Sequence, residues 1–203
     1  MSELSLEHWQ KLMGEWGFTD NKATFIQLSE AYQQPHRAYH NANHVNEVLA
    51  VFGKVRHLAK HPKEIELAIW FHDAIYDMAS STNEKDSAQW AKAFVESNDG
   101  NEDAAQRVYR LIMLTASHCG ADTIDEAIML DSDLCILGSD EGSYNAYEQQ
   151  IRAEYSWVPE QVFYEKRQQV MKQIADQDRI FKTDHFYHQY ERAARLNLHR
   201  YRQ

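Results

Sequence analysis

The stretch IELAIWFHDAIYD (residues 65–77) decides the fold class of this chain. Its apolar residues recur at spacings of three and four, which is the period of one face of a helix. That face includes a histidine, His72, and a carboxylate, Asp73, follows about 100° further around the helix axis. We therefore expect one helix through residues 65–77 that buries an imidazole and half-buries its acidic neighbour.

The segments on either side have the same helical period. Helices are predicted over residues 45–59, 104–115, 124–137, 144–155, 161–179 and 184–201, and a capping box at 81–84 is expected to open another. Asn43 and Asp122 are the predicted N-caps of the helices that follow them. The sequence has no alternating strand pattern, internal repeat or low-complexity linker. The prediction is an all-α fold in which residues 1–203 form one domain, a helical bundle with a core at about 35–140 and C-terminal helices at about 143–203 packed on it.

Composition narrows the classes of function. With 203 residues, 43% of them hydrophobic, the chain can build a sizeable core, and its net charge of −10 argues against a nucleic-acid-coating protein. Two cysteines among apolar neighbours, Cys119 and Cys135, are typical of a reduced, intracellular protein. No apolar run is long enough for a membrane span, and residues 1–5 lack the features of a signal peptide. We expect a cytoplasmic protein with no nucleic-acid or membrane partner.

Carboxylates in apolar helices point to a bound cation. A lone histidine on an apolar face is usually a core residue, but a half-buried Asp73 beside His72 needs a compensating positive charge. Asp131 and Asp133 lie in another apolar helix, and periodicity does not choose between them. With His44, these residue types suit one divalent ion of Mg, Mn, Fe, Ni or Zn.

The order His…His-Asp…Asp on consecutive helices resembles the HD superfamily of metal-dependent phosphohydrolases. More closely, the chain is similar to small bacterial proteins labelled predicted HD phosphohydrolases. The resemblance rests on YHNANH (39–44), WFHDAIYD (70–77), NE (83–84) and LDSDL (130–134), and continues through IRAEY (151–155) and ARLNL (194–198). It covers nearly the whole chain and implies an HD-type helical bundle.

The resemblance also implies roles for individual residues. The metal shell is expected to be His44, His72, Asp73 and Asp133. Asp133 is preferred because the last aspartate of the superfamily usually follows a small residue, here a serine, which leaves Asp131 beside the ligands or the substrate.

Further residues are expected around this shell. Asp77, placed one turn after Asp73, is the expected acid or base, with an exposed salt bridge as an equally weighted alternative. Side chains expected to contact the substrate or the ligands are His40, Glu84, His118, Arg152 and Arg195, and Arg37 and Lys85 are further candidates for phosphate contact.

The function expected from the resemblance is hydrolysis of a phosphate ester or anhydride, in a nucleotide-like small molecule, by a water that the metal activates. Two alternatives stay open. One is a metal- or nucleotide-binding sensor without turnover. The other is an iron-dependent oxygenase of the same fold, which the single histidine between Asp73 and Asp133, His118, makes less favoured because a di-iron site uses more histidines.

Overall fold

A computed structural model describes residues 4–201; residues 1–3, part of the segment used above to judge targeting, and residues 202–203 lie outside the described part. The described chain is helical without strands, which confirms the all-α prediction. Its α-helices are α1 Leu6–Trp16, α2 Lys22–Ala31, α3 Ala42–Val55, α4 Pro62–Phe71, α5 Asn83–Ser97, α6 Glu102–Thr115, α7 Ile124–Asp133, α8 Glu141–Glu154, α9 Glu160–Ala175 and α10 Asp184–Leu198. Three 3₁₀ segments cover Arg56–Leu58, Leu134–Gly138 and His199–Tyr201.

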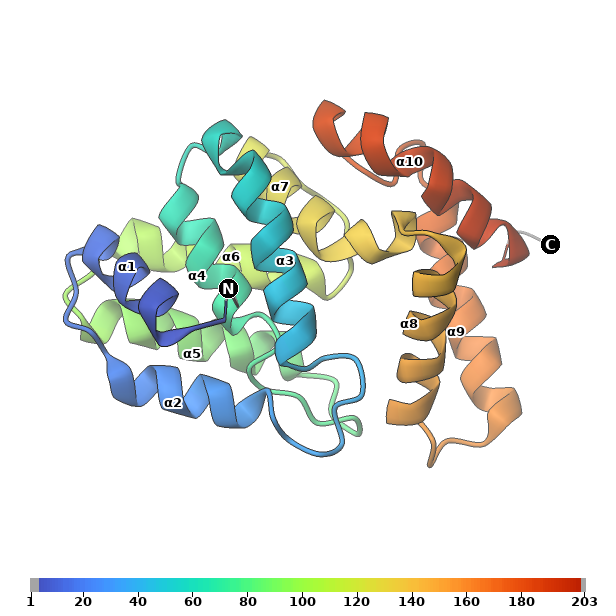
Figure 1. Ribbon diagram of the computed structural model, residues 1–203, viewed down its shortest axis with the longest axis horizontal. Helices are drawn as coiled ribbons and strands as arrows, with labels where there is room; N and C mark the ends of the chain where they lie inside the picture. Colours follow the sequence, from blue (N-terminus) through green and yellow to red (C-terminus); the bar gives the residue numbers. More distant parts are fainter. Residues whose placement is uncertain (1–3, 202–203) are drawn as a thin grey trace.

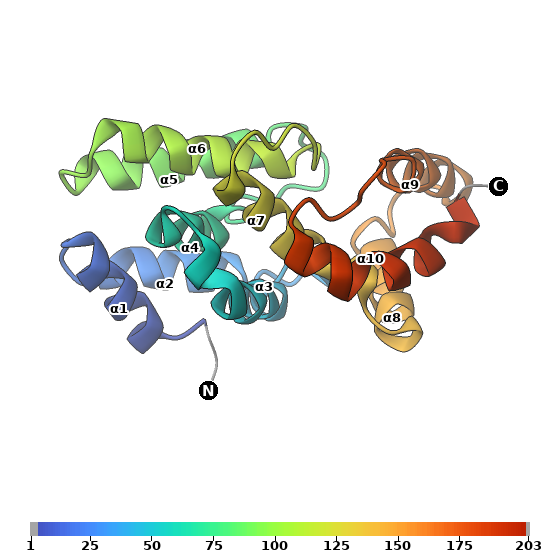
Figure 2. The ribbon, with the colours of Figure 1, turned by 90° about the horizontal axis from the view of Figure 1, so that it is seen from above.

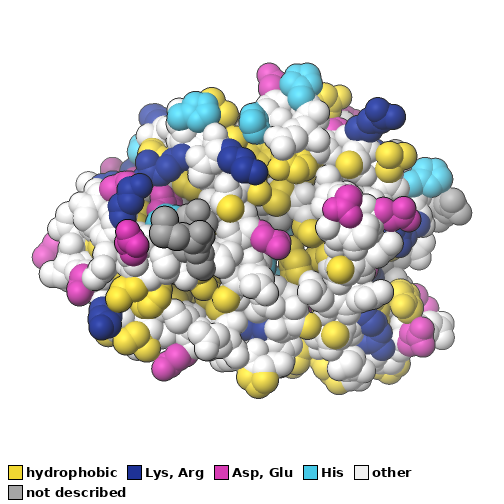
Figure 3. Space-filling model, in the orientation of Figure 1, with side chains coloured by type: hydrophobic (Ala, Val, Ile, Leu, Met, Phe, Trp, Pro, Cys, Tyr) yellow, Lys and Arg dark blue, Asp and Glu magenta, His cyan; other side chains and the backbone are white. Residues whose placement is uncertain are grey.

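The helices form two groups that share one core. Helices α1–α7 make the larger group and α8–α10 the smaller one, and α7 with the 3₁₀ segment after it joins them (Figures 1 and 2). Apolar side chains gather along the boundary between the groups (Figure 3). The buried apolar residues form a single cluster that runs from Trp9 in α1 to Leu198 in α10. This continuity fits the expected single domain.

Helix α4 lies at the centre of the larger group. Every residue from Glu64 to Phe71 is buried, so the helix is enclosed on all sides, and its two glutamates, Glu64 and Glu66, have basic partners. The helix ends at Phe71 and does not continue through Tyr76 and Asp77, so the prediction of one helix over 65–77 is wrong at its C-terminal end. The reason is a tertiary contact. The backbone N–H of Ile75 donates to the hydroxyl of Ser87 in α5, and therefore does not continue the hydrogen bonding of the helix.

Helices α1 and α2 were not predicted. Helix α1 begins at a serine cap, since the Ser5 hydroxyl accepts a hydrogen bond from the backbone N–H of His8. Its buried residues Trp9, Leu12 and Met13 have helical spacing, and this short apolar pattern is the sequence feature from which α1 could have been predicted.

Three predicted helix starts differ in detail. The N-cap of α3 is Asn41 and not Asn43, and its side chain accepts from the backbone N–H of Asn43. The N-cap of α7 is Thr123 and not Asp122, in a full capping box with Glu126. The expected capping box at 81–84 does not form, because the N-cap of α5 makes no side-chain capping bond. The first of these shifts places His44 inside the first turn of α3.

Among the described residues, no helix combines the length and apolar character needed to cross a membrane.

Candidate metal centre

The four expected metal ligands meet where three helix ends converge. His44 lies in the first turn of α3, His72 directly follows α4, Asp73 comes next, and Asp133 is the last residue of α7. Helices α3, α4 and α7 lie side by side in the larger group (Figures 1 and 2). Because the side chains come from helix ends, they can approach one point from different directions.

The donor atoms lie at the separations of neighbouring ligands on one ion. The Nε2 atoms of His44 and His72 are 3.1 Å apart. Asp133 Oδ1 lies 3.2 Å from the first and 3.6 Å from the second, and His44, His72 and Asp133 form a group whose ligand atoms are all within 4.8 Å of one another. Around an ion with bonds of about 2.1 Å, adjacent donors are about 3.0–3.4 Å apart in octahedral or tetrahedral geometry. The residues therefore fit a small divalent ion.

Asp73 joins this group from the side of the histidines. Its Oδ2 lies 3.1 Å from His72 Nε2 and 3.5 Å from His44 Nε2. Asp73 thus contacts both histidines, but it is not one of the three residues whose ligand atoms all lie within 4.8 Å of one another, and its expected role as a ligand stays a prediction.

The electrostatics of the cluster favour a cation. Burial opposes ionisation of Asp73 and Asp133, but the charge of His72 on the first, and hydrogen bonds from His118, His44 and His72 on the second, hold the pKa of both carboxyls below the ordinary range. Burial likewise opposes protonation of His72, yet Asp73 and Asp133 raise its pKa well above the ordinary value. The raised pKa of His72 favours its protonated form in the metal-free cluster, so a bound cation would compete with a proton there.

Two contacts orient the ligands. His72 Nδ1 donates to the carbonyl of Ile69 at 2.8 Å, which leaves Nε2 directed at the cluster. His118 Nε2 donates to Asp133 Oδ2 at 2.8 Å, so it supports a ligand, which is one of the roles foreseen for it. His118 itself has a left-handed backbone with φ 52°, where the chain turns after α6.

Next to the cluster lies a buried glutamate from the smaller helix group. Glu154, the last residue of α8, is 2% exposed. Its Oε1 accepts from the backbone N–H groups of Tyr39 and His40 at 2.8 and 2.9 Å. Its Oε2 accepts from His40 Nδ1 at 2.7 Å and from the Tyr76 hydroxyl at 2.8 Å. The His40 and His44 rings are 6.0 Å apart between centroids, so this network borders the metal cluster.

Glu154 and His40 shift each other's pKa in opposite directions. Burial alone opposes ionisation of Glu154, but its hydrogen bond from His40 lowers its pKa to about 2. Burial lowers the pKa of His40, but the hydrogen bond to Glu154 and the charges of Asp73 and Asp133 raise it above the ordinary value. The imidazole of His40 is therefore suited to carry a proton next to the cluster.

Sequence reasoning overlooked Glu154, although a signal existed. A carboxylate in the last turn of a helix faces the negative end of the helix dipole and is unfavourable there unless something compensates it. Asp133 occupies the same position in α7.

Three acidic residues expected at the site, Asp131, Asp77 and Glu84, make no hydrogen bond or ion pair with the cluster in the described part of the chain. Asp131 is fully buried and accepts from the backbone N–H groups of Lys182 and Thr183 and from the Thr183 hydroxyl, so it anchors the start of α10 and is not beside the ligands. Asp77 is exposed in the loop after α4, where its Oδ1 accepts from the backbone N–H of Ala79. The side chain of Glu84, in the first turn of α5, has no hydrogen bond or ion pair within residues 4–201.

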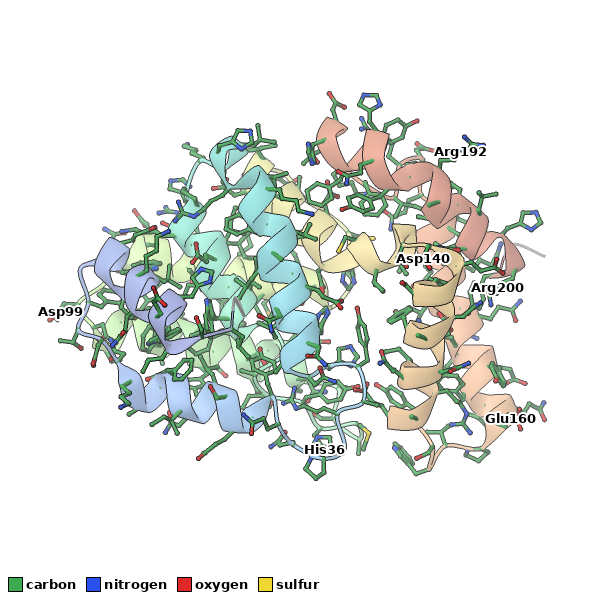
Figure 4. The ribbon with its side chains drawn as sticks, in the orientation of Figure 1. His36, Asp99, Asp140, Glu160, Arg192 and Arg200 are labelled. Carbon is green, nitrogen blue, oxygen red and sulfur yellow. The ribbon has the colours of Figure 1, made fainter. Side chains whose placement is uncertain are left out.

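The arginines expected to contact phosphate have structural partners. Arg152 donates to the carbonyls of Tyr155 and Val158 just after α8, and Arg195 donates to those of Ala175 and Gln177 just after α9. Both close helix ends. The exposed Lys85 has no partner within the described range. Arg192 and Arg200, of the basic C-terminal segment, lie at the outer edge of the smaller group (Figure 4).

Arg37 is also not a surface cation. It is 5% exposed, and Nη1 donates to the carbonyls of His40 and Asp73 at 3.0 and 2.6 Å. Nη2 donates to the carbonyl of Ala74 at 3.1 Å.

Comparison of the chain with family models, with curated proteins and with solved structures gives no match.

Proposed function

We propose that this protein is an HD-type, metal-dependent hydrolase of phosphate esters or anhydrides, acting on a small, nucleotide-like phosphorylated molecule. The observation that supports the proposal best is the convergence of His44, His72 and Asp133 from three helix ends, with Asp73 against both histidines. Two imidazoles and two carboxylates leave coordination positions for water and substrate on a divalent ion.

In this proposal His44, His72, Asp73 and Asp133 hold the ion. When bound, a divalent ion supplies Lewis acidity, which lowers the pKa of water and polarises a phosphoryl oxygen. His118 keeps Asp133 turned toward the histidines through their 2.8 Å hydrogen bond. The carbonyl of Ile69 does the same for His72.

We assign the proton-transfer role to His40 and not to Asp77. Glu154 accepts from Nδ1 of His40, and Nε2 has no hydrogen-bond partner among residues 4–201. A protonated His40 can therefore donate from Nε2 to the leaving oxygen, while Glu154 stabilises the positive charge. Asp77 is exposed, and its carboxylate caps a turn.

Aromatic rings flank this donor. The Tyr76 ring lies 4.6 Å from that of His40, and the Tyr39 ring lies 4.8 Å from that of His44. Tyr39 is buried and Tyr76 is only partly exposed, so the choice of a nucleotide-like molecule rests on the resemblance of the sequence and not on these rings.

The test begins with metal content. Protein purified without chelator and without nickel affinity resin should contain about one divalent ion per chain, and Asp73→Ala should lose it. Asp77→Ala is the matched control, because this exposed aspartate lies outside the cluster. The protein with its metal is then assayed on a panel of phosphate esters and anhydrides.

The outcomes separate the hypotheses. Metal-dependent phosphate release, lost in Asp73→Ala and kept in Asp77→Ala, supports the proposal. Metal binding without turnover of any compound would favour the sensor, and iron with dioxygen consumption would favour the oxygenase. Turnover by metal-free protein, or no metal after reconstitution, contradicts the proposal.

A further inference from the structure

A buried guanidinium lies directly behind the metal cluster. Arg37 is enclosed between the rings of Tyr32 and Tyr76, with its Cζ 5.3 and 5.2 Å from their centroids. Its Nε donates to Gln34 Oε1 at 3.0 Å. Arg37 has no carboxylate partner within hydrogen-bonding distance in residues 4–201, although a buried cation usually has one.

The partners of Arg37 explain why the charge is tolerated. Its remaining donors go to carbonyl oxygens of His40, Asp73 and Ala74. Carbonyls at the C-terminal end of a helix lack intrahelical donors and carry the negative end of the helix dipole, so a cation beside the carbonyls of Asp73 and Ala74 is favourable. Tyr32 adds to this arrangement, because its hydroxyl donates to the carbonyl of Trp70 at 3.0 Å. Together they close the C-terminal end of α4, where His72 and Asp73 emerge.

One atom of this side chain bridges two parts of the site. Arg37 Nη1 contacts the carbonyl of Asp73, which carries a ligand carboxylate, and the carbonyl of His40, the proposed proton donor. These residues are 33 positions apart in the sequence. Together Nε, Nη1 and Nη2 of the planar guanidinium reach four oxygen atoms in one fixed geometry, which lysine, with three donors on one nitrogen, cannot reproduce.

We propose that Arg37 is a positioning residue that sets the Asp73 carboxylate against the two histidines and aligns His40 with the same centre. The inference rests on the metal centre of the proposed function. It concerns how the ligands are held, and it adds no contact between Arg37 and substrate.

A second arginine provides a matched control. Arg195 likewise donates to carbonyls at a helix end, those of Ala175 at the end of α9 and of Gln177 just after it. Unlike Arg37 it also pairs with Glu191, and this helix end carries none of the proposed ligands. If Arg37 only stabilises the fold, Arg37→Lys and Arg195→Lys should differ little in any property other than stability. If Arg37 positions ligands, only its variant should weaken metal binding.

The experiment is a Co²⁺ titration of metal-stripped wild-type protein, Arg37→Lys and Arg195→Lys, followed by the visible spectrum and by calorimetry. Circular dichroism and urea unfolding are measured in parallel. We expect Arg37→Lys to bind Co²⁺ about 10–100-fold more weakly with an altered spectrum, as for residues that orient metal ligands, and Arg195→Lys to bind as wild type. Equal Co²⁺ affinity and spectra in all three proteins would overturn the role of Arg37.

Two further results keep the inference separate from the proposed function. If the wild-type protein does not bind Co²⁺, the metal centre itself is wrong. If Arg37→Lys does not fold, Gln34→Ala is tested instead. Gln34 is exposed, and its replacement removes only the hydrogen bond from Arg37 Nε. We expect Gln34→Ala to weaken Co²⁺ binding measurably, and an affinity equal to wild type would then refute the inference.

Discussion

Replacing Glu154 with glutamine tests the network that joins the smaller helix group to the metal cluster. The carboxylate accepts hydrogen bonds from the backbone N–H groups of Tyr39 and His40 and from the side chains of His40 and Tyr76. Glutamine keeps the shape and one acceptor oxygen, but it has no charge and presents a donor to one pair of these partners. Glu154→Gln should therefore lower both stability and turnover.

The magnitude follows from the pKa of Glu154, which the folded state lowers from 4.5 to about 2. A lowering of that size corresponds to about 3 kcal/mol of unfolding free energy at neutral pH. Because the folded pKa lies below the unfolded one, this stabilisation is present above pH 4.5 and disappears as the pH falls toward 2. The gap between wild type and Glu154→Gln should therefore be about 3 kcal/mol at pH 7 and should narrow in acid.

The assay is urea unfolding followed by circular dichroism at several pH values, together with kcat for a substrate found in the panel. Glu148→Gln is the matched control on the same helix, because Glu148 pairs with Arg167 and accepts from the Tyr201 hydroxyl, outside the Glu154 network. Glu148→Gln should lose stability and keep kcat. A Glu154→Gln protein as stable as wild type at pH 7 would refute the network energetics, and a stability loss with unchanged kcat would refute the role of His40.

Two other predictions concern the centre and its frame. Asp131→Asn should lower the unfolding free energy by about 1–3 kcal/mol, because one of the buried oxygens that accept from Lys182 and Thr183 becomes a donor. The Co²⁺ affinity of this variant should equal that of wild type. Loss of the metal would show that Asp131 is a ligand. Co²⁺ affinity should fall as the pH is lowered, because the pKa of His72 in the metal-free protein is raised and the ion must displace its proton. Calorimetry in buffers of different ionisation enthalpy should detect this proton release. An affinity that does not depend on pH, without proton release, would contradict this account.

The choice between Asp131 and Asp133 shows where sequence reasoning reached its limit. Both lie in α7, about 200° apart around the helix, and each has a leucine on one side and Ser132 on the other. Periodicity shows that each side chain faces the interior of the protein but not which other segment of the chain it contacts. Only the packed structure places Asp133 against His44 and His72, and Asp131 against the start of α10.

The end of α4 was beyond local reasoning for a similar reason. The apolar spacing of residues 65–77 continues past Phe71, so the pattern alone favours a longer helix. Contacts from Arg37 and Ser87, which are distant in sequence, take the backbone groups of residues 73–75 and end the helix. As a result Asp77, which was expected one helical turn after Asp73, lies in an exposed loop.

The sequence by itself determined the helical class of this protein and the pairing of His72 with Asp73, because both depend on residues within one or two helical turns. It also brought His44 and Asp133 into consideration as residues with the right donor chemistry. The tertiary structure alone decided that His44, His72 and Asp133 meet with Asp73 against both histidines, and that Glu154 reaches Tyr39 across 115 positions. It also decided that Arg37 binds carbonyls at a helix end instead of a phosphate. Such contacts depend on which helix faces are buried against each other, and that is a property of the whole packed chain.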